Sequence, residues 1–171
     1  MPETVVVFDT TVLSNLASVD QIDLLRQLYS GRALTTLMVV EELKRGQAAG
    51  YAYRQLALEA IRPFDASGWI EIGTLEAADE QSLYTDLRTG LGAGEASCLA
   101  LAAIRGLTLA TDDYAARRES RRRSITLTGT LGVLVRAIRE NRLTLSEGNA
   151  LLARMITLRY RAPVERLDDY V

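Results

Sequence analysis

The sequence of 171 residues contains no histidine and a single cysteine, Cys98. Without histidine, serine-hydrolase triads, cysteine–histidine proteases, histidine-based ribonucleases and histidine-ligated zinc sites are excluded. One cysteine can form neither an internal disulfide nor a zinc cluster. The apolar neighbours of Cys98 predict a buried, inert thiol on a helix face. Any catalysis must therefore rest on carboxylates, hydroxyls or basic groups.

Long apolar runs are also missing. The longest, Thr4 to Phe8 and Leu99 to Ile104, fall far short of the roughly 20 residues that a membrane helix needs, and the N-terminus lacks a basic-then-apolar signal pattern. A content of 48% hydrophobic and 25% charged residues is typical of globular proteins. We expect a soluble, cytoplasmic protein with no membrane partner. One domain should cover residues 1–162, with residues 163–171 as a loose tail or a short docking element.

Short apolar runs alternate with helical patterns along the chain. The predicted strands are Thr4 to Phe8, Ala33 to Thr35, Trp69 to Ile72, Leu107 to Thr111 and Ile125 to Leu127. The predicted helices are Gln21 to Tyr29, Leu37 to Arg45, Tyr53 to Ile61, Ala77 to Leu87, Gly94 to Arg105, Thr130 to Glu140 and Ser146 to Tyr160. This alternation predicts an α/β fold with a parallel sheet.

The net charge of −2 conceals an uneven distribution. Up to Ile104 there are 7 basic and 14 acidic residues, whereas from Arg105 onward there are 13 basic and 8 acidic residues. A domain that holds cations and also approaches a polyanion could use such a division. Charged helix surfaces that serve solubility would give the same counts, so this pattern is weak evidence.

Carboxylates follow two of the predicted strands. Asp9 ends the first strand, and Asp112 and Asp113 follow the strand Leu107 to Thr111. Parallel strands bring their carboxyl ends to one edge of the sheet, where open α/β folds bind ligands. The sequence therefore predicts that these acids meet at that edge.

Two further acids lie on predicted helices. Glu42 follows Glu41, and because a helix turns by about 100° per residue, one of the two can face inward. Glu95 lies at the start of an apolar helix, where it is either a charge favoured by the helix dipole or a ligand in a cleft. Any one of these acids alone could be a solvated or capping charge.

Gathered together, the acids would need a counter-charge. Two like charges about 4 Å apart repel by roughly 4 kcal/mol at an effective dielectric of 20. With only oxygen ligands available, the natural cation is Mg²⁺ or Mn²⁺.

Several short motifs, in order, resemble the PIN-domain superfamily, and specifically its bacterial and archaeal branch of small toxin-like nucleases. The matching stretches are Val7 to Leu13, Val40 to Leu43, Gly94 to Ala96, Ala110 to Asp113 and Thr128 to Leu134. The resemblance extends from Val5 to Arg159. It implies a three-layer α/β/α fold with a central parallel sheet of four or five strands.

The resemblance also implies a function and a site. It implies an acidic pocket with one or two Mg²⁺ or Mn²⁺ ions and hydrolysis of RNA, with Asp9, Glu42 and Glu95 at the first three acidic positions. Asp113 matches the fourth position better, although Asp112 could serve instead. Metal-assisted hydrolysis would then use Asp9 with the third and fourth acids as ligands, while Glu42 binds a second ion or orients the water.

Polar and basic neighbours complete the expected site. Thr11, Asn15 and Thr111 are supporting residues, with helix capping as an equal alternative for Thr11. Four arginines on the following helix, Arg117, Arg118, Arg121 and Arg122, could grip RNA phosphates or could form an exposed, solvated face.

The resemblance further suggests a homodimer and a small antitoxin that binds the acidic cleft, as in a type II toxin–antitoxin pair. Two alternatives stay open. The first is a noncatalytic PIN-like module that binds nucleic acid or protein, and the second is a nuclease directed at DNA structures.

Overall fold

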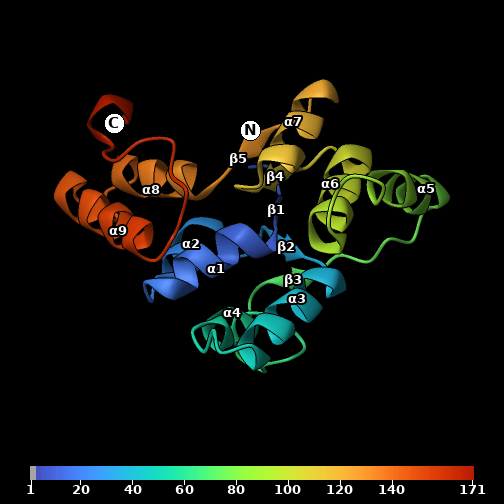
Figure 1. Ribbon diagram of the computed structural model, residues 1–171, viewed down its shortest axis with the longest axis horizontal. Helices are drawn as coiled ribbons and strands as arrows, with labels where there is room; N and C mark the ends of the chain where they lie inside the picture. Colours follow the sequence, from blue (N-terminus) through green and yellow to red (C-terminus); the bar gives the residue numbers. More distant parts are fainter. Residues whose placement is uncertain (1–2) are drawn as a thin grey trace.

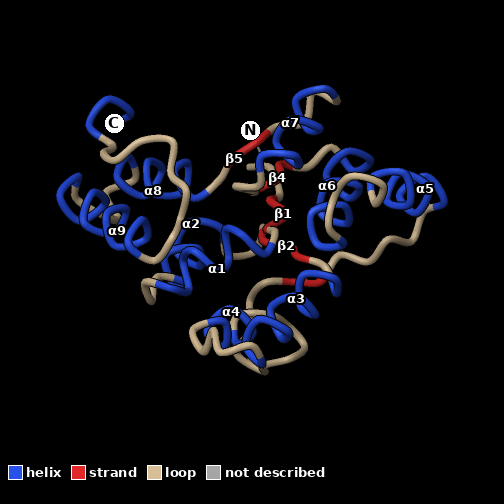
Figure 2. Tube along the Cα trace, in the orientation of Figure 1, coloured by secondary structure: helices blue, strands red, loops and turns tan. Residues whose placement is uncertain are grey.

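Five short parallel strands form one sheet in the order β3-β2-β1-β4-β5. The computed structural model describes residues 3–171. The strands are β1 (Val6–Phe8), β2 (Ala33–Thr35), β3 (Glu71–Ile72), β4 (Thr108–Ala110) and β5 (Leu127–Thr128), drawn in red in Figure 2. The predicted α/β fold with a parallel sheet of four or five strands is confirmed.

Helices cover both faces of the sheet (Figure 1). They are α1 (Thr10–Ser18), α2 (Ile22–Tyr29), α3 (Leu37–Ala48), α4 (Arg54–Glu59), α5 (Ala78–Leu87), α6 (Ala93–Arg105), α7 (Tyr114–Arg122), α8 (Thr130–Arg139), α9 (Leu145–Thr157) and the 3₁₀ turn η1 (Asp168–Tyr170). Helices α1, α2, α8 and α9 lie on one side of the sheet, and α5, α6 and α7 on the other. Within residues 3–171, no helix is both long and apolar enough to cross a membrane.

The central strand β1 separates the two halves of the chain. β1 pairs with β2 on one side and with β4 on the other, so Phe8 lies opposite Ala110. The chain first builds outward through β2 and β3, then returns across β1 to β4. The point of reversal therefore lies between the carboxyl ends of β1 and β4, which is where open α/β sheets bind ligands.

The helix α1 was absent from the sequence prediction. Its sequence holds Thr, Ser and Asn residues that weakly favour helix, and it lacks the long charged residues of an exposed helix. Its stability comes from burial of Leu13 and Leu16 and from Asp9, which caps its first turn. The strand β2 has the predicted bounds, and the other four strands are shorter than predicted; β1, for instance, begins at Val6 and not at Thr4.

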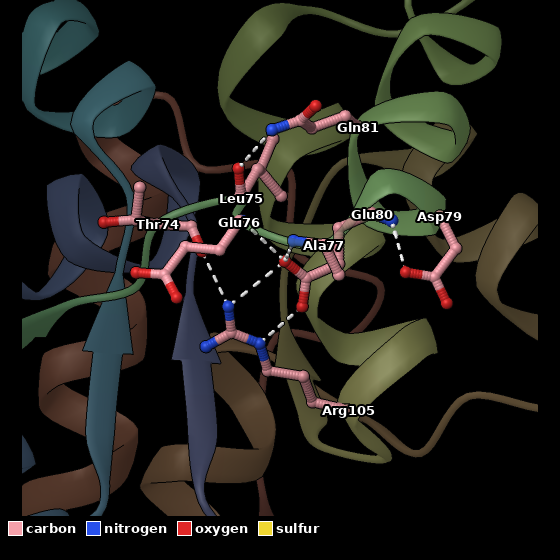
Figure 3. Close-up of polar contacts among 8 residues, drawn as sticks. All are labelled: Thr74, Leu75, Glu76, Ala77, Asp79, Glu80, Gln81 and Arg105. Carbon is pink, nitrogen blue, oxygen red and sulfur yellow. Dashed lines mark hydrogen bonds and ion pairs between the residues drawn. The ribbon is translucent and has the colours of Figure 1, made fainter.

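An ion pair between the buried Glu80 and the solvent-accessible Arg105 fixes α5 to α6, the helix that carries Glu95 (Figure 3). Arg105 donates from Nε to Glu80 Oε1 at 2.6 Å and from Nη2 to the carbonyl of Thr74 at 2.6 Å. The Glu80 side chain is only 3% exposed and also accepts from the N–H groups of Glu76 and Ala77. Gly106, with φ of 65°, ends α6 in the left-handed conformation that favours glycine.

The segment after residue 162 packs against the domain. The side chain of Leu167 is fully buried in the main core, and its N–H donates to Asn149 Oδ1 at 2.8 Å. Arg139 reaches the carbonyl of Tyr170. These contacts hold the end of the chain against α8 and α9.

Candidate functional site

Asp9 lies at the carboxyl end of β1 with its side chain fully buried. Its Oδ1 accepts hydrogen bonds from the N–H groups of Thr11 and Val12 and from the Thr11 hydroxyl at 2.7 Å. The hydroxyl of Thr111, at the end of β4, donates to Oδ2. Asp9 therefore joins the ends of the two strands at the reversal point. Thr11 supports Asp9, and the helix-capping alternative for Thr11 is wrong because Asp9 is the cap.

Burial has a clear electrostatic effect on Asp9. Desolvation raises the pKa of this carboxyl to about 7, although the hydrogen bonds from Thr11, Thr111 and Val12 act in the opposite direction. A charge held in this position would be stabilised by a nearby cation. Thr111 also accepts a hydrogen bond from the N–H of Asp113, which fixes the turn after β4.

Glu42 connects the first acid to the third. Its Oε2 accepts from the Thr10 hydroxyl at 2.5 Å, next to Asp9, and its Oε1 accepts from the N–H of Gly94 at 2.8 Å, next to Glu95. A Cβ at Gly94 would overlap the Glu42 carboxylate, so glycine permits this close approach.

Glu95 has an unfavourable electrostatic environment. Partial burial raises its pKa, and the negative charges of Glu42 and Asp113 raise it further. The backbone hydrogen bond of Glu95 acts in the opposite direction, as does the more weakly acting charge of Arg88. Glu95 on α6 is therefore exposed to the charges of carboxylates on α3 and on the β4–α7 turn, a repulsion that a cation would relieve.

Asp112 is held by donors on both carboxylate oxygens. Oδ2 accepts from Asn15 Nδ2 at 3.0 Å and from the Thr130 hydroxyl, and Oδ1 accepts from the Thr130 N–H at 2.9 Å. The Tyr160 hydroxyl lies 3.4 Å from Oδ1, and burial beside Asp112 raises the pKa of Tyr160. Asn15 therefore contacts Asp112 directly and has no recorded bond to Asp9.

Asp113 differs from its neighbour. Its Oδ1 caps α7 by accepting from the N–H of Ala116 at 2.7 Å, while its Oδ2 has no hydrogen bond from any residue that the structure describes. The two adjacent aspartates therefore differ in their contacts. Both carboxylate oxygens of Asp112 are hydrogen-bonded within the domain, whereas only one oxygen of Asp113 is.

A family model described as PIN domain matches residues 5–170. The chain belongs to the PIN-domain family. A search of curated proteins gave no match. PIN domains are commonly nucleases and usually bind divalent metals, so this chain has a fold of the nuclease type.

The donor set of this PIN domain suits a hard divalent cation. The side chains at the site offer carboxylate and hydroxyl oxygens, the ligands that Mg²⁺ and Mn²⁺ prefer. The uncompensated charge around Glu95 is also what such an ion would neutralise. Among residues 3–171, no three acidic or cysteine side chains already surround a common point. Glu42, Glu95, Asp113 and Asp9 could hold the ion. Asp9 and Asp112 each already accept four hydrogen bonds, whereas Asp113 keeps one oxygen without a donor from the described residues.

The four arginines that sequence reasoning grouped on α7 have different surroundings in this PIN domain. Arg117 donates from Nη1 to the carbonyls of Thr111 and Thr128, which ties β4 to β5. Arg122 forms an ion pair with Glu119, as does Arg123. Arg118 and Arg121 are exposed. Arg117 thus has a structural contact, whereas its neighbours face solvent.

Three polar residues of the site were missed by sequence reasoning. Thr10 holds Glu42, while Thr130 and Tyr160 hold Asp112. Thr130 falls inside one of the motifs of the family resemblance and could have been found there. Nothing in the sequence around Tyr160, which follows the last turn of α9, points to a residue 48 positions earlier.

Cys98 lies behind the acids as a fully buried thiol. It contacts the carbonyl of Phe8 at 3.6 Å, and burial raises its pKa well above the usual value. The expectation of a buried, unreactive thiol agrees with both observations.

Proposed function

We propose that this PIN domain hydrolyses phosphodiester bonds of RNA in a reaction that depends on Mg²⁺ or Mn²⁺. The observation that carries the proposal is the position of Glu42, which accepts hydrogen bonds from Thr10, next to the buried Asp9, and from the N–H of Gly94, next to Glu95. The negative charges of Glu42 and Asp113 also raise the pKa of Glu95, so these acids repel one another. A protein gains no stability from such repulsion. Such an arrangement is explained if the acids bind a cation that takes part in phosphodiester hydrolysis.

The surroundings of the two adjacent aspartates favour Asp113 as the fourth acid. Asp113 keeps one carboxylate oxygen without a donor from the described residues, whereas both oxygens of Asp112 accept hydrogen bonds from Thr130. We therefore assign Asp9, Glu95 and Asp113 as metal ligands and Asp112 as the residue that positions the turn. Glu42 would bind a second ion or orient the attacking water.

The metal would activate a water and stabilise the charge that develops on the phosphate. Hydrogen bonds from neighbouring residues hold the acidic side chains in place. Thr11 and Thr111 fix both oxygens of Asp9, and Thr10 together with the Gly94 N–H fixes Glu42. Such supporting hydrogen bonds determine ligand orientation.

The test is cleavage of an end-labelled RNA pool by purified protein with Mn²⁺ and with EDTA. Asp9→Asn and Glu42→Gln should abolish cutting. Glu41→Gln is the matched control, because Glu41 precedes Glu42 on α3 but is exposed, and this variant should cut normally. Cutting that survives in EDTA or in Asp9→Asn would contradict the proposal.

The same assay addresses the alternatives. RNA binding without cutting by the wild-type protein would favour the noncatalytic binding module, and cutting of DNA in preference to RNA would favour a DNA-directed nuclease. Intact acids at all expected positions argue against the noncatalytic module.

We further propose that the protein acts in the cytoplasm as the toxin of a type II toxin–antitoxin pair, as a homodimer bound by a small antitoxin. The support is the likeness of its motifs to small prokaryotic toxin-like nucleases. Expression should stop growth, and coexpression of a short adjacent gene should restore it. Normal growth during expression of a protein that cuts RNA in vitro would count against a toxin role.

A further inference from the structure

The helix α7 presents two unlike faces. Ala116 and Ser120, four residues apart, are fully buried against the domain. At 100° per residue, Tyr114, Arg118 and Arg121 share the opposite face, and all three are exposed. One helix therefore carries an aromatic ring and two cations along its solvent side, starting directly after Asp113.

Tyr114 is the most exposed large hydrophobic residue of the described chain, with 74% of its surface accessible. The guanidinium carbon of Arg118 lies 6.0 Å from the centre of its ring. The recorded ion pairs of α7 join Arg122 and Arg123 to Glu119, and no carboxylate oxygen of residues 3–171 lies within 4.0 Å of Arg118 or Arg121. The charge on this face is not neutralised from within the domain.

A cavity of about 160 Å³ opens beside this face. Its lining comes from the end of α5, from the loop before α6 and from α7 with its C-cap, and it includes two acids as well as two arginines: Asp86, Leu87, Thr89, Gly90, Leu91, Ala115, Arg118, Glu119 and Arg123. Ala115 comes two residues after Asp113, and Leu91 comes four residues before Glu95. The cavity thus lies close in sequence to the third and fourth acids, with the end of α5 as a further wall.

We propose that Tyr114 and Arg118 form a binding subsite for single-stranded RNA, with one base stacked on the Tyr114 ring and a neighbouring phosphate at Arg118. The subsite rests on the proposed ribonuclease function, whose acidic centre repels phosphates and needs nearby cations to retain a strand. Stacking on aromatic rings and contacts from arginine are the usual means of holding single strands. A duplex would keep its bases stacked inside and could not use the exposed ring.

The test is fluorescence anisotropy of a short labelled single-stranded RNA, titrated with protein in EDTA so that cutting does not interfere. Tyr114→Ala should weaken binding by roughly fivefold or more, because aromatic–base stacking contributes at least that much. Tyr114→Phe should bind like the wild type, since the ring remains. Arg118→Gln should make the slope of log affinity against log salt concentration less steep, by about the amount that corresponds to one lost phosphate contact.

The chain offers a matched control in Tyr51. This tyrosine is also exposed, at 52%, and also has an arginine near its ring, with Arg54 at 5.4 Å, but it lies in the α3–α4 connection away from α7 (Figure 1). Tyr51→Ala should leave RNA binding unchanged. Equal losses in Tyr51→Ala and Tyr114→Ala would overturn the subsite, as would unchanged binding by Tyr114→Ala. A changed oligomeric state of Tyr114→Ala with unchanged RNA affinity would instead assign the ring to a protein interface.

Cleavage assays separate the subsite from the function on which it rests. With Mn²⁺, Tyr114→Ala should raise KM and leave kcat nearly unchanged, because the ring binds the strand and does not contact the reacting bond. A wild-type protein that cuts RNA while Tyr114→Ala behaves identically would overturn the subsite alone. A wild-type protein that binds RNA through Tyr114 but never cuts would overturn the ribonuclease alone, and one that neither binds nor cuts RNA would overturn both.

Discussion

Asp112 and Thr130 are joined by two hydrogen bonds, one from the Thr130 N–H to Oδ1 at 2.9 Å and one from its hydroxyl to Oδ2 at 2.5 Å. The residue at the start of α8 is Gly129, which has no side chain to cap the helix. The end of β4 therefore supplies that cap through Asp112, from 18 residues away. This contact fixes α8 to the edge of the sheet where the acids meet.

The different surroundings of Asp112 and Asp113 predict opposite phenotypes. Asp112→Asn should lower the free energy of unfolding by about 2 kcal/mol, because it weakens hydrogen bonds to a charged acceptor. Asp113→Asn should change it by less than about 0.5 kcal/mol, since Asn caps α7 equally well, yet it should abolish cleavage. Urea denaturation and the RNA assay on both variants measure this. Full stability in Asp112→Asn would contradict the assignment.

Metal binding predicts a thermal shift. Mn²⁺ at about 100 times its Kd should stabilise the folded protein by about 2.7 kcal/mol, which corresponds to roughly 5–10 °C for a chain of this size. Asp9→Asn and Glu95→Gln should lose most of this gain. In EDTA, Glu95→Gln should melt no lower than the wild type, because the substitution removes repulsion from Glu42 and Asp113. Differential scanning fluorimetry tests both statements, and an unshifted wild type would count against the site.

The close contact between Gly94 and Glu42 predicts that a substitution at Gly94 lowers activity without lowering stability. Gly94→Ala should keep or slightly raise the free energy of unfolding, since alanine favours a helix by up to about 1 kcal/mol over glycine. Its Cβ would displace the carboxylate of Glu42, so kcat should fall. Gly90→Ala is the control, because nothing lies within 4 Å of its added Cβ. Unchanged kcat in Gly94→Ala would show that the position of Glu42 does not matter.

The ion pair of Glu80 and Arg105 predicts a dependence of stability on pH. The hydrogen bond from Arg105 lowers the pKa of Glu80 from 4.5 to about 2. A carboxyl with a lowered folded pKa stabilises the protein fully above its unfolded pKa and loses that contribution as the pH falls toward the folded value. Urea denaturation between pH 5 and 2 should therefore show a loss of about 2 kcal/mol that is missing in Glu80→Gln.

A control for the last prediction is Glu71→Gln. Glu71 lies 3.6 Å from Arg62, and both side chains are more than half exposed. Exposed pairs contribute well under 1 kcal/mol. Glu71→Gln keeps the Glu80–Arg105 pair, so it should lose about as much stability between pH 5 and 2 as the wild type. A loss that is missing in Glu71→Gln as well would show that the hydrogen bond from Arg105 to Glu80 is not the source of the effect.

The sheet and its carboxyl edge could be predicted because they follow from local chemistry. The β-branched and aromatic run from Thr4 to Phe8 indicates a buried strand, and a parallel sheet brings the end of that strand beside Thr111. The helix α1 was missed because its residues favour helix weakly and its stability comes from tertiary burial. Helix propensity and hydrophobic periodicity, which are the signals available in the sequence, do not include the stability that a helix gains from tertiary burial.

The different roles of neighbouring residues could not be predicted either, because they depend on contacts with segments that are distant in the sequence. Asp112 and Asp113 are chemically identical, and only the approach of Asn15, Thr130 and Tyr160 makes them differ. The sequence likewise predicts an exposed charge at Arg117, but in the structure its guanidinium donates to the carbonyls of Thr111 and Thr128 at the ends of two strands. Contacts between distant segments assign these roles.

The all-parallel sheet also sets an order of assembly during synthesis. Asp9 is made early, but its partner Thr111 comes 102 residues later, and the Thr130 hydroxyl that accepts a hydrogen bond from Asn15 comes 115 residues after Asn15. A growing chain on the ribosome therefore carries the first acid long before its surroundings exist. The site is completed only when most of the protein has emerged. Under the proposed ribonuclease function, an unfinished copy would therefore have no assembled centre with which to cut the messenger that encodes it.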